Sequence, residues 1–246
     1  MCRHVGYLGA PVSLANLLVD PPYSLQVQSY APRRQRYGRV NADGFGVGWY
    51  TPSRPEPVRY RRSQPMWTDA SFASLAPTVD TACFLAAVRC ATPGSPVDES
   101  CTAPFTYWQW LFSHNGQLAD HSRVRKMLCD GAEVPDALAG VDSAFLFSLA
   151  VARWQAGAAL ADGLAGVVSD VAVAGGGRLN LLATDGQRLA ATVSGDSLFV
   201  RAGGGSVLLA SEPLDDQLGW TELPPDSLVD AGLDGITVTA LGVVCP

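Results

Sequence analysis

Short apolar runs bounded by turn residues recur along most of the chain, and a helical block interrupts them in the middle. Runs of this kind predict strands. They lie at about 4–9, 44–50, 57–62, 83–89, 107–113, 178–184, 188–193, 197–201, 206–211 and 236–243. Strands on both sides of a helical block, joined by turns such as Thr184-Asp185-Gly186, favour two antiparallel sheets over a βαβ array.

Apolar residues at helical spacing predict five helices. Two short helices cover 13–19 and 69–76, the second with Asp69 as its N-cap. Asp120 caps a third helix, Asp142 opens a fourth, and an Ala-rich segment at about 159–173 forms a fifth. We expect these helices to cover the outer faces of the sheets. The Pro-rich stretches are too short to be interdomain linkers, so one domain should span 1–246.

The charge is acidic overall but uneven along the chain. The net charge is −6, and 48% of the residues are hydrophobic, which excludes a disordered chain and disfavours a general nucleic-acid binder. Between Arg33 and Arg62, however, eight Arg stand against two acids, giving +6, so the remainder carries −12. This basic segment is either the anion-binding side of a substrate cleft or a solvated face. No apolar run is long enough for a membrane helix, so we expect neither a nucleic-acid nor a membrane partner.

The six cysteines show no metal-type spacing and no leader sequence precedes them, so we expect no metal and reduced thiols in the cytoplasm. Cys83, Cys101, Cys129 and Cys245 receive no role. Cys2 is different, because removal of the initiator Met would make it N-terminal. An N-terminal Cys supplies a thiol nucleophile and, in its own α-amine, a base of pKa about 7.7–8.0. The alternative is an ordinary buried Cys at a strand start.

Four further residues have chemistry that complements such a nucleophile. Arg89 ends an apolar strand, where its guanidinium can grip a carboxylate. Asn115 and Gly116 follow Ser113-His114 at the end of another strand and can donate to an oxyanion. Asp142 can bind an ammonium group. Each also has an ordinary structural interpretation: a surface ion pair for Arg89, a hairpin turn for Asn115-Gly116, a helix cap for Asp142. Together they describe recognition of a γ-glutamyl amide.

The sequence resembles the class II glutamine amidotransferases, a family of N-terminal-nucleophile hydrolases. The resemblance rests on six segments in the family order: 1–4, 41–50, 88–92, 113–116, 142–143 and 210–214. It implies an α+β fold, a four-layer αββα sandwich of two antiparallel sheets flanked by helices. It also implies that Cys2 is the nucleophile, Asn115 and Gly116 the oxyanion hole, and Arg89 and Asp142 the ligands of the substrate α-carboxylate and α-ammonium groups.

Other residues lie in or beside the implied pocket. Thr92 follows Arg89 in the same motif, and Cys90 replaces the Trp or Ser usual in the family, which affects leaving-group recognition. His114 adjoins the oxyanion residues; since the α-amine is the base in the family, we interpret His114 as structural. Trp67, in a Pro-flanked loop, is a candidate aromatic surface for the leaving group, whereas Trp108 and Trp110 should share one buried face of a strand.

Within this family, the segments around residues 2–11 and 36–46 look most like stand-alone members that release glutamate from a γ-glutamyl amide without transferring ammonia. The resemblance implies no cofactor and no obligatory protein partner, and leaves a homo-oligomer open. Two alternatives remain: a glutaminase subunit that passes ammonia to a separate synthase, and a noncatalytic binding module on the same fold.

Overall fold

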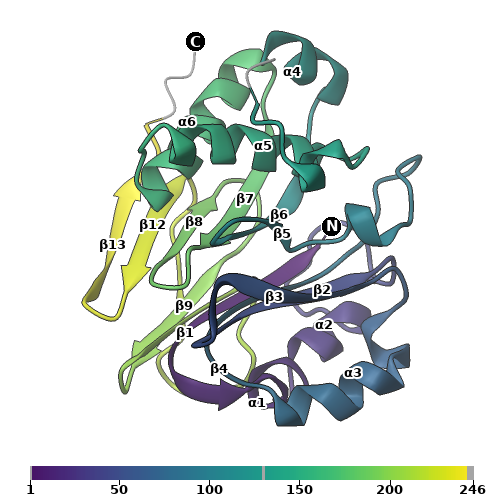
Figure 1. The fold of residues 1–246 in the computed structure, drawn as a ribbon, viewed down its shortest axis with the longest axis vertical. Coiled ribbons are helices and arrows are strands. Elements are labelled where there is room, and N and C mark those ends of the chain that lie inside the picture. The colour runs from purple at the N-terminus through teal and green to yellow at the C-terminus, as the bar shows by residue number, and fades with distance from the viewer. Residues whose placement is uncertain (1, 129–130, 243–246) are drawn as a thin grey trace.

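Two antiparallel sheets lie face to face at the centre of the molecule, and helices cover both outer faces (Figure 1). The computed structural model describes residues 2–128 and 131–242. The layers therefore run helices, sheet, sheet, helices, which confirms the expected αββα sandwich.

The seven-stranded sheet has the order β11-β9-β10-β1-β4-β2-β3. Its strands are β1 (Arg3–Ser13), β2 (Phe45–Thr51), β3 (Arg54–Arg62), β4 (Asp80–Val88), β9 (Phe199–Gly203), β10 (Ser206–Ala210) and β11 (Thr221–Glu222). The strand that follows Cys2, β1, is central. It pairs with β10 on one side and β4 on the other, so the residue preceding it is held at an inner position of the sheet.

The six-stranded sheet has the order β13-β12-β8-β7-β6-β5. Its strands are β5 (Phe105–Tyr107), β6 (Trp110–Leu118), β7 (Gly177–Thr184), β8 (Leu189–Val193), β12 (Ser227–Gly232) and β13 (Gly235–Ala240). The long pairing of β6 with β7 sets Asn115 opposite Asn180. This pairing organises the part of the sheet that faces the start of β1.

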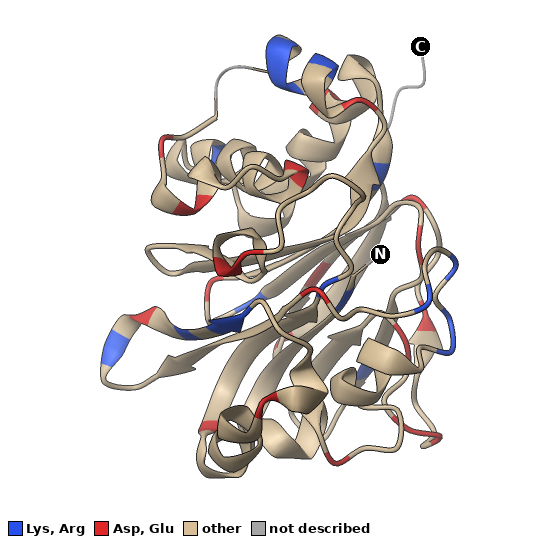
Figure 2. Cartoon of the chain, turned by 90° about the vertical axis from the view of Figure 1, so that its right-hand side faces the viewer, with Lys and Arg blue, Asp and Glu red and all other residues tan. Residues whose placement is uncertain are grey.

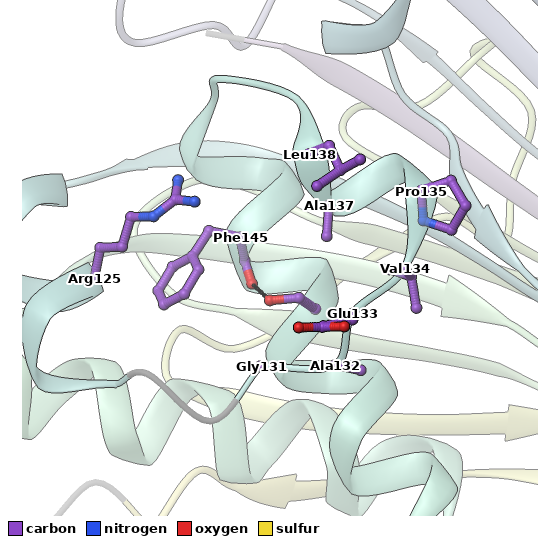
Figure 3. A pocket seen from close by; sticks show the side chains of 10 residues that line it. Arg125, Gly131, Ala132, Glu133, Val134, Pro135, Ala137, Leu138 and Phe145 are labelled. Atoms are coloured by element: carbon purple, nitrogen blue, oxygen red, sulfur yellow. Dashed lines mark hydrogen bonds between the residues drawn. The ribbon is translucent and has the colours of Figure 1, made fainter.

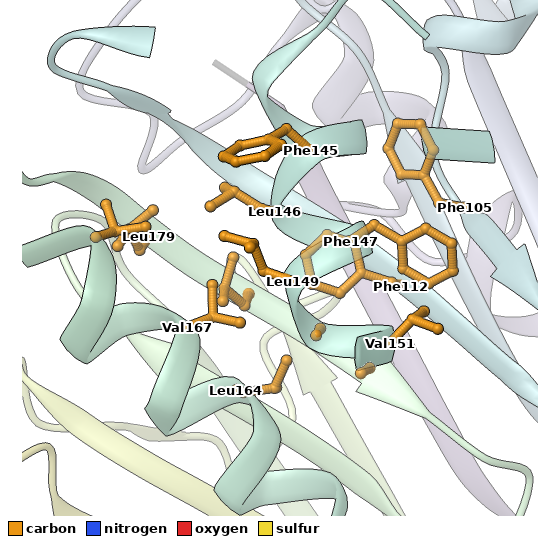
Figure 4. Packing of buried hydrophobic residues seen from close by; sticks show 14 of the residues in the cluster. Phe105, Phe112, Phe145, Leu146, Phe147, Leu149, Val151, Leu164, Val167 and Leu179 are labelled. Carbon is orange, nitrogen blue, oxygen red and sulfur yellow. The ribbon is translucent and has the colours of Figure 1, made fainter. Parts of the chain in front are cut away.

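Three apolar cores separate the four layers. Leu8, Leu85, Leu182 and Leu209 belong to the core between the sheets. Helices α1 (Leu14–Leu18), α2 (Leu25–Tyr30) and α3 (Ala70–Leu75) cover the seven-stranded sheet over a second core. Helices α5 (Asp142–Gln155) and α6 (Leu160–Ala174) cover the six-stranded sheet over a third, where Phe112 of β6 packs on Phe147 of α5 (Figure 4). The remaining helix, α4 (His121–Met127), follows β6.

The predicted helices are confirmed, including the caps at Asp69 and Asp120, whose side chains accept the N–H groups of Phe72 and Arg123. The predicted strand at 107–113 is wrong, because Trp108 has a φ of 50° and lies in the turn between β5 and β6. Helix α2 and strands β11 and β12 were not predicted. The last residue of the predicted strand 236–243 lies outside the described residues. No helix of the described chain is long and apolar enough to cross a bilayer.

Figure 2 marks the basic and acidic positions along the ribbon. Acidic side chains from elsewhere in the chain form ion pairs with several arginines of the basic segment. Asp136 pairs with both Arg59 and Arg61, and Arg62 pairs with Asp69 and Glu99. Arg33 pairs with Asp216. The +6 of residues 33–62 is thus largely matched by acids of the −12 remainder.

Candidate active site

The register of β1 against β4 brings Cys2 beside Arg89. Arg3 pairs with Val88, so in this antiparallel arrangement the residue before Arg3 faces the residue after Val88. Strand β2 lies on the other side of β4, where Phe45 pairs with Val88 and the carbonyl of Gly44 accepts the N–H of Arg89 (2.8 Å). Two segments 87 positions apart in sequence therefore meet at one end of the sheet.

The Cys2 thiol is partly buried at this sheet end. Burial raises the pKa of the Cys2 thiol above its ordinary value, whereas the backbone N–H of Cys90 and the Arg89 guanidinium act in the opposite direction. Burial is the larger effect, so the thiol keeps its proton at neutral pH. A nucleophile in this position needs a base to accept that proton.

Arg89 is buried, and its backbone N–H and carbonyl both bond to the segment 43–44. Its carbonyl accepts the N–H of Asp43 (2.9 Å), and its Nη1 donates to the carbonyl of Asp43 (3.4 Å). The Asp43 carboxylate in turn accepts the N–H of Ala91 (2.8 Å). Asp43 therefore shapes the segment 89–91, a role that sequence reasoning missed although the residue stands in one of the motifs.

Asn115 and Gly116 lie inside β6, not at the end of a strand as expected, and the hairpin-turn interpretation is wrong. The N–H of Leu179, which faces Gly116 across the β6–β7 pair, donates to Ser194 on the far side of β7 (2.7 Å). Gly116 and Leu179 are therefore a non-hydrogen-bonded pair, and the N–H of Gly116 points away from β7. Strand β5 pairs with 110–112, and no other described strand pairs with this edge of β6, so among the described residues the edge is open at Gly116.

Close packing explains why residue 116 is glycine. A Cβ at this position would lie 1.8 Å from the carbonyl oxygen of Arg178 and 2.4 Å from Nε2 of His114. A side chain at residue 116 would therefore separate β6 from β7. The glycine permits the strands to pair while its N–H remains on the open edge.

Asp142 binds the same open edge of β6. Its Oδ2 accepts the N–H of Leu118 (3.0 Å), and its Oδ1 accepts the N–H of Ser143 (2.8 Å). Leu118 lies two residues after Gly116, so the two N–H groups point the same way about 7 Å apart. The carboxylate opens α5 as expected, and it also lies along the edge that carries the candidate oxyanion donor.

Both ring nitrogens of His114 have partners. Nε2 lies 2.9 Å from the carbonyl of Arg178, an acceptor, so this nitrogen carries a proton. Nδ1 lies 3.0 Å from Oγ of Ser143, beside Asp142. His114 thus bridges β7 to the start of α5. This arrangement favours the structural interpretation of His114 over a role as general base.

A buried ionic cluster joins the nucleophile strand to β6. Arg3 pairs with Asp196 (Nη1 to Oδ2, 3.0 Å), with both side chains fully buried, and Asn115 Nδ2 donates to the same oxygen (3.3 Å). A second link is the 3.3 Å contact between His4 Nδ1 and Ser113 Oγ. Burial, Arg3 and His114 lower the pKa of His4 to about 3, so His4 is neutral. Neither Arg3 nor Asp196 was singled out from the sequence.

The remaining expected pocket residues are less closely connected. Thr92 closes a turn in which its carbonyl accepts the N–H of Ser95 (2.9 Å). Trp67 lies in a short 3₁₀ helix, 40% exposed, edge-on to Tyr30 of α2. Trp108 is 68% exposed and does not share a buried face with Trp110, which packs on Trp154 of α5, so that expectation is wrong. Cys83 and Cys101 are buried free thiols; Cys129 and Cys245 lie outside the described residues.

A cavity of about 690 Å³ lies near the start of α5 (Figure 3). Arg125 of α4, Phe145 of α5 and the segment 131–138 line it. Its described lining contains none of the residues expected in the active site. Among the described residues, no group of three His, Cys, Asp or Glu side chains is arranged to hold a metal ion.

Comparison with known proteins gives one family and several full-length relatives. The family described as "Glutamine amidotransferases class-II" matches residues 13–203. A protein of Mycolicibacterium smegmatis named gamma-glutamyl-hercynylcysteine sulfoxide hydrolase is 46% identical over 242 residues, which cover 98% of this chain and 100% of that protein. The protein of the same name from Mycobacterium tuberculosis is 44% identical over 98% of this chain and 97% of its own length.

Solved structures show the same fold. A glutamine aminotransferase class-II domain protein from Silicibacter pomeroyi superposes with a TM-score of 0.68 at 27% identity, over 97% of this chain and 99% of its own. The glutamine phosphoribosylpyrophosphate amidotransferase of Bacillus subtilis gives a TM-score of 0.68 at 15% identity, where 98% of this chain covers 49% of that enzyme. At that identity the second match supports the fold alone.

Proposed function

Because this chain belongs to the class II glutamine amidotransferases, we propose that it hydrolyses a γ-glutamyl amide through a thioester on Cys2, and that its substrate is γ-glutamyl-hercynylcysteine sulfoxide, in ergothioneine biosynthesis. The observation that carries this substrate assignment is the 46% identity to a hydrolase of that name along its whole length. The opening segment Cys2 to Pro11 and the Arg-Cys-Ala-Thr-Pro-Gly motif at 89–94 support the same assignment, because both look like that hydrolase.

In this proposal the γ-glutamyl group is held by its two charged α-substituents. The Arg89 guanidinium binds the α-carboxylate, and its position next to Cys2 sets the distance from that carboxylate to the reacting carbonyl. Asp142, fixed by two backbone N–H groups, binds the α-ammonium group. Both charges are needed to hold the γ-carbonyl carbon within reach of the thiol, which is the positioning part of catalysis.

The first chemical step forms the thioester. After removal of Met1, the free α-amine of Cys2 takes the thiol proton, and sulfur attacks the γ-carbonyl carbon. Negative charge moves to the carbonyl oxygen, where Asn115 Nδ2 and the N–H of Gly116 stabilise it. The C–N bond then breaks, the α-ammonium group of Cys2 returns its proton to the leaving nitrogen, and the amine departs.

The second step releases glutamate. Water attacks the thioester carbonyl while the α-amine accepts its proton, and the same two donors stabilise the second oxyanion. When the C–S bond breaks, sulfur takes the proton back. Because burial raises the pKa of the Cys2 thiol, the thiol needs the nearby amine to accept its proton before sulfur can attack.

The decisive experiment measures glutamate release from a panel of glutamine, γ-glutamyl dipeptides and γ-glutamyl-hercynylcysteine sulfoxide. We expect release from the sulfoxide conjugate to exceed release from glutamine by at least about tenfold in kcat/KM. Equal rates would remove the substrate assignment and keep the reaction class. Preference for glutamine would instead favour a glutaminase subunit that supplies ammonia to a synthase.

The Cys2→Ala variant tests the reaction class itself. We expect turnover to fall to background while the melting temperature and the affinity for the substrate stay near those of the wild type, because the thiol contributes chemistry rather than binding. A wild-type protein that forms no covalent adduct with a glutamine-analogue electrophile would favour the noncatalytic binding module.

A further inference from the structure

We propose that Asp196 is a positioning residue that fixes the orientation of the Asn115 side-chain amide, so that an N–H rather than the amide oxygen faces the oxyanion; this rests on the proposed function. Asp196 lies in the segment between β8 and β9, 81 residues from Asn115 in sequence. One carboxylate oxygen, Oδ2, accepts both Asn115 Nδ2 (3.3 Å) and Arg3 Nη1 (3.0 Å).

The terminal amide of Asn is nearly symmetric in shape. Rotation by 180° about the last side-chain bond of Asn exchanges the oxygen and the NH₂ group with almost no change in shape. An ionised carboxylate only accepts hydrogen bonds, so a carboxylate next to the amide selects the orientation in which NH₂ faces it. The NH₂ group has two hydrogens. Asp196 takes one, and the other remains for the oxyanion.

Without Asp196, Asn115 has little to hold this orientation. Its Oδ1 is buried and has no hydrogen-bond partner among the described residues. Because the amide oxygen makes no hydrogen bond, it does not stabilise that orientation. In the reverse orientation the amide oxygen, which is the negative end of the amide dipole, would face the developing oxyanion. The charge of Asp196 is therefore what distinguishes a stabilising Asn115 from a repelling one.

The Asp196 backbone is itself fixed by the cross-strand partner of Asn115. The Asn180 side chain accepts the N–H of Asp196 (3.1 Å) and donates to its carbonyl (2.8 Å). Asn180 and Asn115 face each other across β6 and β7. The position of the Asp196 carboxylate is thus set by the same pair of strands that carries the oxyanion residues. Its other oxygen, Oδ1, accepts the N–H of Ser197 (3.0 Å).

Arg3 supplies the positive charge that pairs with this carboxylate where both side chains are fully buried. Arg3 directly follows Cys2, so the group that orients Asn115 also binds the strand that carries the nucleophile. Glu212 is a second acid beside Arg3, with 3.9 Å between its Oε1 and Nε, but its other oxygen accepts the N–H groups of Arg33 and Arg34. No described contact of Glu212 reaches Asn115, which makes Glu212 the matched control.

The test compares Asp196→Asn with Glu212→Gln, since each removes one negative charge near Arg3 at constant size. We expect Asp196→Asn to lower the single-turnover acylation rate about 10- to 100-fold, somewhat less than loss of a complete oxyanion donor. The substrate Kd, measured in a Cys2→Ala background, should change less than about threefold. Glu212→Gln should leave the acylation rate within about threefold.

A double-mutant cycle identifies the route of the effect. In an Asn115→Ala background, Asp196→Asn should change the acylation rate less than about twofold, because the amide through which Asp196 acts is gone. An undiminished effect there, or an equal loss in Glu212→Gln, would overturn the proposal and assign Asp196 to general stability. If Asp196→Asn does not fold, the double variant Arg3→Gln/Asp196→Asn is used in its place, because it removes both buried charges together.

A spectroscopic readout separates this inference from the proposed function. The side-chain NH₂ signals of Asn115, identified by their loss in Asn115→Ala, should shift in Asp196→Asn and stay in place in Glu212→Gln. This result needs no turnover, so a wild type that fails to release glutamate would refute the proposed function and leave the orientation of Asn115 measurable. Unshifted NH₂ signals in Asp196→Asn would refute the orientation.

Discussion

Asp142 and Leu118 are joined by a hydrogen bond from a strand edge to the first residue of a helix, with 3.0 Å between the Leu118 nitrogen and Oδ2. The bond fixes the carboxylate along the same open edge of β6 from which the N–H of Gly116 points. A recognition group for an ammonium ion and a donor for an oxyanion are thereby placed on one rigid strand.

Asp142→Asn should weaken binding of the product glutamate by about 2 kcal/mol, or about 30-fold in Kd, because a neutral amide cannot pair with the α-ammonium group. Asp120→Asn is the control, since Asp120 caps α4 in the ordinary way. Both variants should lose comparable stability, about 0.5–1 kcal/mol. Equal glutamate affinity in the two variants, measured by titration calorimetry, would reduce Asp142 to a helix-opening residue.

Arg89→Lys should lose about 2–4 kcal/mol of transition-state binding, because an ammonium group cannot grip a carboxylate with two parallel bonds. The loss would be measured as kcat/KM for the best substrate. Arg188→Lys provides the comparison, because Arg188 also pairs with carboxylates, those of Asp230 and Asp234. It lies just before β8, toward the end of the β6–β7 pairing that is farther from Gly116. Unchanged kinetics in Arg89→Lys would remove Arg89 from the pocket.

Gly116→Ala should destabilise the protein by at least about 2 kcal/mol, because the added Cβ meets the Arg178 carbonyl at 1.8 Å. Backbone atoms cannot yield as a flexible side chain would, so β6 and β7 must move apart. Gly140→Ala is the matched control, with no atom within 4 Å of the added Cβ. Urea unfolding of both variants checks this, and similar midpoints would contradict the packing argument.

The stability of the protein should fall with acid partly through His4, whose pKa is lowered to about 3 in the folded state from 6.5. Above pH 6.5 the imidazole is neutral in both states. As the pH falls from 6.5 toward 3, His4 binds a proton in the unfolded chain but not in the folded one. The free energy of unfolding therefore drops by up to about 1.4 kcal/mol per pH unit.

His4→Asn isolates this contribution, because the Asn amide can keep the bond to Ser113 and does not titrate. Urea unfolding between pH 4 and 7 should give a shallower pH dependence for the variant than for the wild type. Burial raises the pKa of Glu212, which contributes an opposite slope to both proteins and cancels in their difference. Parallel curves for the two proteins would show that His4 titrates alike in both states.

Local sequence patterns predicted the layers well because each layer has its own periodicity. Helix α5 shows apolar residues at helical spacing and begins at Asp142, and both agree with the structure, although the N-cap residue is Val141 and no side chain caps the helix. The hairpin of β5 and β6 was missed because every residue from Tyr107 to Leu111 except Gln109 is apolar, which suggests one strand. The turn at Trp108 requires a positive φ from a residue type that gives no such signal.

The candidate site could be predicted only as far as single residues have a recognisable chemistry. Cys2, Arg89 and Asn115 were proposed because their chemistry and family motifs single them out. Asp43 and Asp196 were not, since their importance lies in what they bind, and pairing between residues as distant as Arg3 and Asp196 is set by sheet register. The open edge of β6 was likewise invisible, because it depends on where β5 ends.

The central position of β1 has a consequence for the order of events during synthesis. Residues 3–13 leave the ribosome early, and their neighbours in the sheet are residues 80–88 and 206–210, so one edge of the strand stays unpaired until almost the whole chain exists. For most of translation β1 can therefore pair only with β4, and it becomes an inner strand of the sheet when residues 206–210 have been made.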